Sequence, residues 1–209
     1  MDNKEVTRRA HNAIARQYYE AYKDDITDLE YFDKYLSMFK GSILDLGCGM
    51  GHYSNYMFNK GFSVVGVDFS SEMIKLAKQI NNNIEFIEHD ICDLSFLNGR
   101  KFDGIVIAYV LQHLSKDEVL TLFRNIENLV KDESKMLLFW REGDAVVSEV
   151  EPMNTEYEYI INEYNKDTIT KVLNDNNWDV LSIEEKEFVE DPNSLAPNTL
   201  VVVATRTNR

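Results

Sequence analysis

The sequence has few cysteines, few basic side chains and no long apolar run. Its 209 residues include two cysteines, which cannot form a disulfide framework, and no Cys/His cluster has metal-ligand spacing. No apolar run approaches the roughly 20 residues that span a bilayer, and the polar start Met1-Asp-Asn-Lys-Glu is unlike a signal peptide. We therefore expect a cytoplasmic protein with reduced thiols, no metal site and no membrane association.

Acidic residues outnumber basic ones by 36 to 22, and the formal net charge is −14. A chain of this charge repels polyphosphates at long range, and no local basic patch offsets the repulsion. Nucleic acid is therefore disfavoured as a partner. The hydrophobic fraction of 44% is ample for one core, and neither internal repeats nor low-complexity tracts divide the chain.

Three glycines interrupt the chain after a short apolar run. The run from Ile43 to Leu46 has the length of a buried strand, Gly47, Gly49 and Gly51 follow at every second position, and helical spacing resumes at Tyr53. Strand, glycine turn and helix begin a nucleotide-binding βαβ unit, in which glycines let the backbone turn sharply and approach a ligand.

The glycine spacing discriminates between ligands. A dinucleotide fingerprint reads G-x-G-x-x-G/A, but His52 stands where its third small residue belongs, so a nicotinamide oxidoreductase is a disfavoured alternative. Asp68 ends the next apolar stretch, 21 residues after Gly47 (68 − 47), which is the spacing of an acid that binds ribose hydroxyls. The alternative for Asp68 is an ordinary helix cap.

Further strands and helices alternate along the chain. Apolar stretches predict strands over 84–87, 102–108 and 135–140, and a capping box at Ser115 predicts a helix after the second of them. The last two stretches, 178–188 and 199–204, are joined by 191–197 without a helix, so we expect the final strand to insert antiparallel.

The glycine loop preceded by Asp45, the acid Asp68, the pair Asp90-Ile91 and the terminal hairpin together resemble the class I S-adenosylmethionine-dependent methyltransferases, over roughly residues 40–206. The resemblance implies an α/β fold with a doubly wound, seven-stranded, mostly parallel Rossmann-like sheet and an antiparallel C-terminal hairpin. It also implies an N-terminal helical lid (1–40) on a methyltransferase domain (41–209). Residues 143–165 follow a central strand and are expected to form an acceptor-site insertion, with an acidic solvated insertion as the alternative.

The resemblance further implies that the chain binds S-adenosylmethionine. Asp68 would bind the ribose and Asp90 the adenine amino group, with Ile91 packing on the ring. The full set of expected cofactor-binding residues is Asp45, Gly47, Cys48, Gly49, Asp68, Phe69, Met73, Asp90, Ile91 and Ala108.

The acceptor is less well defined, and we expect a small molecule bound by a monomer or homodimer. Ala108-Tyr-Val-Leu111 replaces the Asn/Asp-Pro-Pro-aromatic turn that the family uses on nucleobase amines or glutamine. Candidates near the reacting end are Tyr18, Tyr19, Tyr109, His113 and Arg141. The tyrosines could instead pack the helix, His113 could be structural, and Arg141 could pair with Glu142 or Glu163. A module that binds the cofactor or a partner without turnover is the alternative function.

Overall fold

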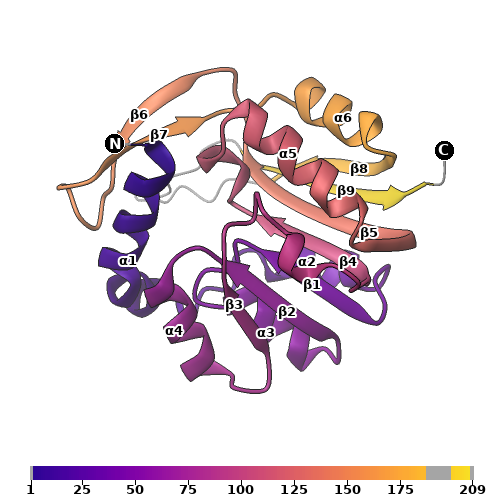
Figure 1. Ribbon diagram of the computed structural model, residues 1–209, viewed down its shortest axis with the longest axis horizontal. Coiled ribbons are helices and arrows are strands. Elements are labelled where there is room, and N and C mark those ends of the chain that lie inside the picture. Colours follow the sequence, from indigo (N-terminus) through magenta and orange to yellow (C-terminus); the bar gives the residue numbers. More distant parts are fainter. Residues whose placement is uncertain (1, 187–198, 208–209) are drawn as a thin grey trace.

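A seven-stranded sheet forms the centre of the protein, seen in a computed structural model that describes residues 2–186 and 199–207 (Figure 1). The strand order is β3-β2-β1-β4-β5-β9-β8, and β9 runs antiparallel to both of its neighbours while the other pairs up to β5 are parallel. The expected sheet and antiparallel insertion are therefore confirmed, whereas the turn at 191–197 and residues 187–188 lie outside the described residues. The strands are β1 (Ser42–Leu46), β2 (Ser63–Asp68), β3 (Glu85–Glu88), β4 (Phe102–Ala108), β5 (Val130–Arg141), β8 (Trp178–Glu185) and β9 (Thr199–Arg206).

Helices cover both faces of this sheet, so each central strand is buried on both sides. Along β4, Ile105 and Ile107 pack toward the α5–α6 side, while Val106 packs toward the α2–α3–α4 side. This explains why β4 is apolar without alternation. The helices are α1 (Asn3–Tyr22), α2 (Leu29–Leu36), α3 (His52–Asn59), α4 (Ser71–Ile80), α5 (Lys116–Glu127) and α6 (Lys166–Asp175), with short 3-10 turns η1 (Ser95–Leu97) and η2 (Leu111–His113).

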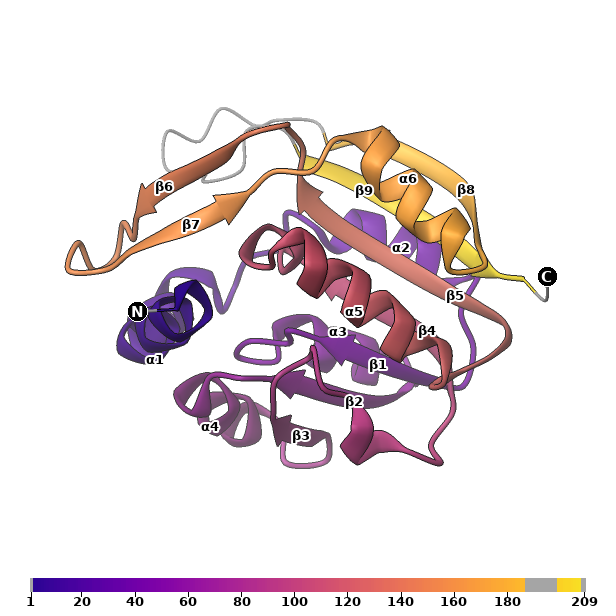
Figure 2. The same cartoon turned by 45° about the horizontal axis from the view of Figure 1, so that its top comes forward.

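The helix α1 is separate from these layers and lies near the carboxyl edge of the strands, between α4 and the β6–β7 hairpin (Figure 2). The Asn3 side chain pairs both ways with the backbone of Ile160, at 3.1 Å and 2.7 Å. At mid-helix, the Asn12 Oδ1 accepts hydrogen bonds from the Ser70 hydroxyl (2.8 Å) and the Glu72 amide (3.1 Å). These contacts fasten α1 to two separate elements.

The segment 143–165 is not an irregular loop. It forms an antiparallel hairpin of β6 (Val146–Val150) and β7 (Glu158–Asn162). The buried side chains of Tyr159 and Ile161 pack against Ala10 of α1. Five-residue strands carry too short a pattern to be recognised locally, and the apolar side of β7 is defined only by a helix more than 140 residues away in the sequence.

Smaller differences concern strand ends. The strand β5 begins at Val130 rather than at residue 135, because its first residues pair with Phe102 across a register shift. The capping box at Ser115 is confirmed. Within the described residues, no helix is both long and apolar enough to cross a membrane, and no group of three or more His, Cys, Asp or Glu side chains could hold a metal ion.

Candidate functional site

The glycine turn after β1 is held tightly against β2. The amides of Gly47 and Cys48 both donate to the Val67 carbonyl, at 2.8 Å and 3.0 Å. Gly47 has φ +75°, and a Cβ there would lie 2.2 Å from a methyl carbon of Val110. Both the left-handed backbone and the close contact require glycine at this position.

Gly49 differs from Gly47 in what surrounds it. Its φ is +52°, but an added Cβ would meet no atom of the described residues within 4 Å. Packing within the chain therefore does not explain the missing side chain. Backbone that faces open space at a strand–turn–helix junction is suited to close contact with a ligand.

The carboxylate of Asp68 lies beside this turn at the end of β2. It is 8% exposed, and its two oxygens accept from the amides of Gly49 (2.9 Å) and Ser70 (2.8 Å). Burial raises the pKa of Asp68, and the two amide hydrogen bonds oppose that rise. Each oxygen retains a further lone pair, so the group can still accept hydroxyl protons from a ligand.

Asp45 occupies a different environment beneath the turn. Its carboxyl is buried and accepts a hydrogen bond from the Ser54 hydroxyl at 2.6 Å. Burial raises the pKa of Asp45 to about 7, Ser54 lowers it, and the neighbouring Asp68 raises it further. Direct contact of Asp45 with a cofactor stays a prediction.

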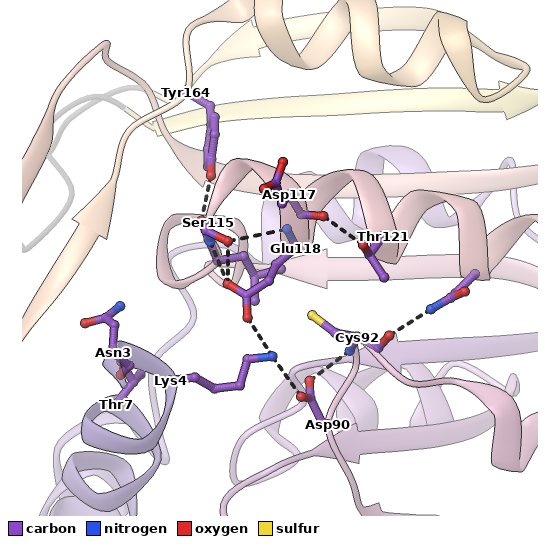
Figure 3. Close-up of polar contacts among 12 residues, drawn as sticks. Asn3, Lys4, Thr7, Asp90, Cys92, Ser115, Asp117, Glu118, Thr121 and Tyr164 are labelled. Carbon is purple, nitrogen blue, oxygen red and sulfur yellow. Dashed lines mark hydrogen bonds and ion pairs between the residues drawn. The ribbon is translucent and has the colours of Figure 1, made fainter. Parts of the chain in front are cut away.

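The adenine end expected from the sequence lies under the first turns of α1. Asp90 follows β3, is half-buried and accepts from the Cys92 amide (2.9 Å) and the Lys4 ammonium (2.8 Å; Figure 3). Ile91 is buried in the core, and Met73 of α4 packs against Ile14 of α1. The contact with Lys4 was not predicted, because Lys4 is 86 residues from Asp90 in the sequence.

The residues after β4 join a hydrogen-bond network that the sequence did not reveal. Tyr109 has φ +60°, and its hydroxyl donates to Asp28 at 3.0 Å. The Tyr53 hydroxyl also donates to Asp28, and Lys186 forms an ion pair with that buried carboxylate, both at 2.5 Å. Burial and the charge of Asp28 raise the pKa of Tyr109. Tyr109 is therefore a hydrogen-bond donor, and Ala108 at its N-terminal side is half-buried at the end of β4.

The two tyrosines of α1 differ in their surroundings. The Tyr18 ring lies 4.6 Å from that of Tyr22 and packs beside Met50 of the glycine turn. Burial raises the pKa of Tyr18. Tyr19 belongs to the same cluster, with the Lys23 ammonium 5.7 Å from its ring centre.

His113 belongs to an aromatic cluster with His11 of α1 and Tyr159 of β7. Its ring centre lies 5.4 Å from that of His11 and 5.6 Å from that of Tyr159. The Nδ1 atom is buried without a hydrogen-bond partner in the described part of the chain. Burial and the charge of His11 lower the pKa of His113 to about 3. The ring is neutral at pH 7 and a weak base, which disfavours general-base catalysis.

Arg141 ends β5 and forms ion pairs with Glu149 of β6 and, at 2.8 Å, with Glu163. The pairing with Glu163 that the sequence left open is therefore present. These contacts join the hairpin to the central sheet, and a role of Arg141 in acceptor binding stays a prediction.

The sequence also matches one family of known proteins. The family described as "Methyltransferase domain" matches residues 43–133. "Putative methyltransferase YqeM" of Bacillus subtilis (strain 168) is 36% identical over 121 residues, which cover 56% of this chain and 48% of that protein. An "Uncharacterized methyltransferase" of Alkaliphilus oremlandii is 23% identical over 200 residues, covering 88% of this chain and 84% of the relative.

A solved structure supports the same fold. Magnesium protoporphyrin IX methyltransferase (ChlM) from Synechocystis PCC 6803, crystallised with S-adenosylhomocysteine (SAH), superposes with a TM-score of 0.76 at 17% identity and covers 99% of this chain and 100% of that one. The chain spans about half the length of the Bacillus relative. The glycine turn and the ordered acids lie within the matched sequence, on a sheet with the expected strand order. The matched domain and the superposed fold therefore support a class I S-adenosylmethionine-dependent methyltransferase.

Proposed function

We propose that the chain transfers the methyl group of S-adenosylmethionine to a small-molecule nucleophile. The observation that carries the proposal is the open left-handed turn at Gly49 beside the buried carboxylate of Asp68. A ligand that fits this site packs against the backbone at Gly49 and offers hydroxyl groups to the Asp68 carboxylate. S-adenosylmethionine can do both.

The residues present fit the cofactor at three points. The turn at 47–51 would lie under its amino acid part, Asp68 would accept its ribose hydroxyls, and Asp90 would accept its adenine amino group. The hydrogen bonds to ionised carboxylates are of the stronger, charge-assisted kind. When bound, S-adenosylmethionine supplies a methyl group activated by its positively charged sulfur.

The chain's own part in the reaction is to orient the acceptor and exclude water. Tyr18 of α1, which packs in the same cluster as Met50 of the turn, would border the acceptor. Holding a nucleophile in line with the methyl group can lower the activation free energy by about 7–11 kcal/mol. His113 is a weak base, and the tyrosines Tyr18 and Tyr109 give up their protons less readily than usual. We infer that the acceptor attacks the methyl group without first losing a proton to a strongly basic side chain.

A small-molecule acceptor is supported by the charge of the chain and by a structural neighbour. The net charge of −14 disfavours polyanionic macromolecules. The neighbour ChlM is named for a small molecule, magnesium protoporphyrin IX. Sustained release of SAH from labelled donor with a panel of small amines, acids and phenols would separate an enzyme from a module that only binds the cofactor.

Replacing Asp68 by alanine tests the ribose assignment. We expect the dissociation constant for SAH, measured by calorimetry, to rise about tenfold, because a hydrogen bond to a charged group contributes about 1.5 kcal/mol or more. Asp33→Ala is the control, since Asp33 is an exposed acid paired with Lys60 and Tyr56. Asp68→Asn keeps one oxygen that can accept from the amide of Gly49 or Ser70. It therefore shows whether disruption of the glycine turn alone explains the loss of SAH affinity. Unchanged affinity in Asp68→Ala would remove the ribose assignment.

A further inference from the structure

A cavity of about 280 Å³ lies between the first turns of α1 and the loops that follow β2 and β3. Phe69, which follows β2, supplies an aromatic ring to this cavity, and His89, after β3, supplies a second. Asp90 also faces it, and α1 closes the other side. The complete lining is Asp2, Lys4, Glu5, Arg8, Phe69, Glu88, His89 and Asp90. Half of the lining therefore comes from α1 and its N-cap residue Asp2, outside the nucleotide-binding unit.

The Lys4 ammonium is the link between that helix and the sheet. It lies 2.8 Å from the Asp90 Oδ2 and 2.6 Å from the Glu118 Oε1 (Figure 3). Each acid has a second anchor, since Asp90 accepts from the Cys92 amide and Glu118 accepts from the Ser115 amide in the capping box of α5. One cation thus joins α1, the loop after β3 and the start of α5.

These contacts fix both the orientation and the charge of Asp90. Each oxygen accepts one hydrogen bond, from Lys4 or from Cys92, so the carboxylate is restrained from rotating. Burial raises the pKa of Asp90, but the hydrogen bonds from Lys4 and the Cys92 amide outweigh burial and hold the pKa below its usual range. The group therefore stays an acceptor, with lone pairs left for an amino group in the cavity.

We propose that Lys4 is a positioning residue of the adenine subsite, which holds the Asp90 carboxylate ready to accept the exocyclic amino group of the cofactor. The inference rests on the proposed function, because Asp90 recognises adenine only if the chain binds S-adenosylmethionine. It adds that α1 completes the purine subsite and that Lys4 determines how well the subsite selects adenine.

The positioning of Asp90 by Lys4 can be distinguished from a role of Lys4 in docking α1. The Asn3–Ile160 pair and the contacts of Asn12 with Ser70 and Glu72 also hold α1, and neither touches Asp90. Loss of Lys4 should therefore leave α1 docked but change the carboxylate. If the first turn of α1 strengthens purine binding at Asp90, a bound purine must strengthen the docking of that turn by the same free energy, because such coupling is reciprocal.

The test compares the affinities of SAH and its 6-deamino analogue, which has purine in place of adenine. Calorimetry on the full chain should show about tenfold preference for the adenine compound in the unchanged protein, since the amino group donates to an ionised carboxylate. In Lys4→Met the preference should fall to about twofold or less while the analogue binds within about threefold of its original affinity. Lys4→Gln gives the same result if Lys4→Met folds poorly.

Three variants serve as controls. Lys4→Arg keeps the cation and should keep the preference, as should Glu118→Gln, which removes only the second acid. Lys23→Met removes an exposed lysine that caps the C-terminal end of α1 and pairs with Glu20, and should leave both affinities unchanged.

The outcomes separate this inference from the function. If Lys4→Met weakens both compounds equally, Lys4 only fastens the helix and the positioning role is overturned. If Lys4→Met keeps the full preference, the role is overturned as well. If the unchanged protein binds neither compound, the proposed function fails, and the inference fails with it.

Discussion

Replacing Gly49 by alanine should weaken SAH binding roughly 100-fold. The added methyl group enters open space in the chain alone, because no described atom lies within 4 Å of its position. Once the cofactor occupies that space, the methyl group collides with it, and forcing an extra methyl into a filled site costs up to about 3 kcal/mol. The loss therefore arises on binding rather than on folding.

Gly61→Ala is the matched control for this change. Gly61 also has a left-handed backbone, with φ +96°, and likewise no described atom within 4 Å of an added Cβ, but it follows α3 away from the turn. Each substitution should cost about 1–2 kcal/mol of stability from the left-handed conformation, measured by urea unfolding. Only Gly49→Ala should lose affinity in calorimetry. Equal affinities of the two variants would show that the cofactor does not contact Gly49.

The second large effect is the pH dependence of stability caused by Asp45. Its pKa is raised from 3.8 to about 7 by burial, with Ser54 lowering it and Asp68 raising it. The folded chain therefore binds this proton more tightly than the unfolded chain. Its stabilising contribution is complete below pH 4 and is lost as the pH rises toward 7, at about 1.4 kcal/mol per pH unit. The total is on the order of 4 kcal/mol.

Asp45→Asn should remove this dependence. Its amide oxygen can still accept from Ser54, and it has no proton to lose. Urea unfolding at pH 5, 6, 7 and 8 should show that the variant gains stability relative to the unchanged protein as the pH rises, by as much as about 3 kcal/mol between the extremes. Ser63→Ala, at an exposed position at the start of β2, is the control, and its stability should follow that of the unchanged protein at every pH. A constant difference between variant and parent across the range would mean that Asp45 does not titrate there.

Local features were predictable from the sequence. The glycine turn, the acid at the end of β2 and the capping box at Ser115 each depend on residues within a few positions of one another, so their spacing identifies them. The apolar runs of β4 and β9 identified central strands for the same reason, because burial on both faces leaves a continuous run.

Contacts between distant segments were not predictable. Lys4 reaches Asp90 across 86 residues, and Tyr109 reaches Asp28 across 81. No period or spacing encodes such partners, since they depend on how α1 and the loops meet at one edge of the sheet. The β6–β7 hairpin was missed because its apolar side exists only against α1.

The sequence by itself determined the resemblance to the methyltransferases, the sheet and the order of the acids along it, because strands, turns and caps are set by neighbouring residues. Only the tertiary structure decided which of those acids are buried and what each one binds. Burial and pairing depend on the whole chain: Asp45 is enclosed beneath the turn with its pKa near 7, while Asp90 is held ionised by a lysine from the first helix.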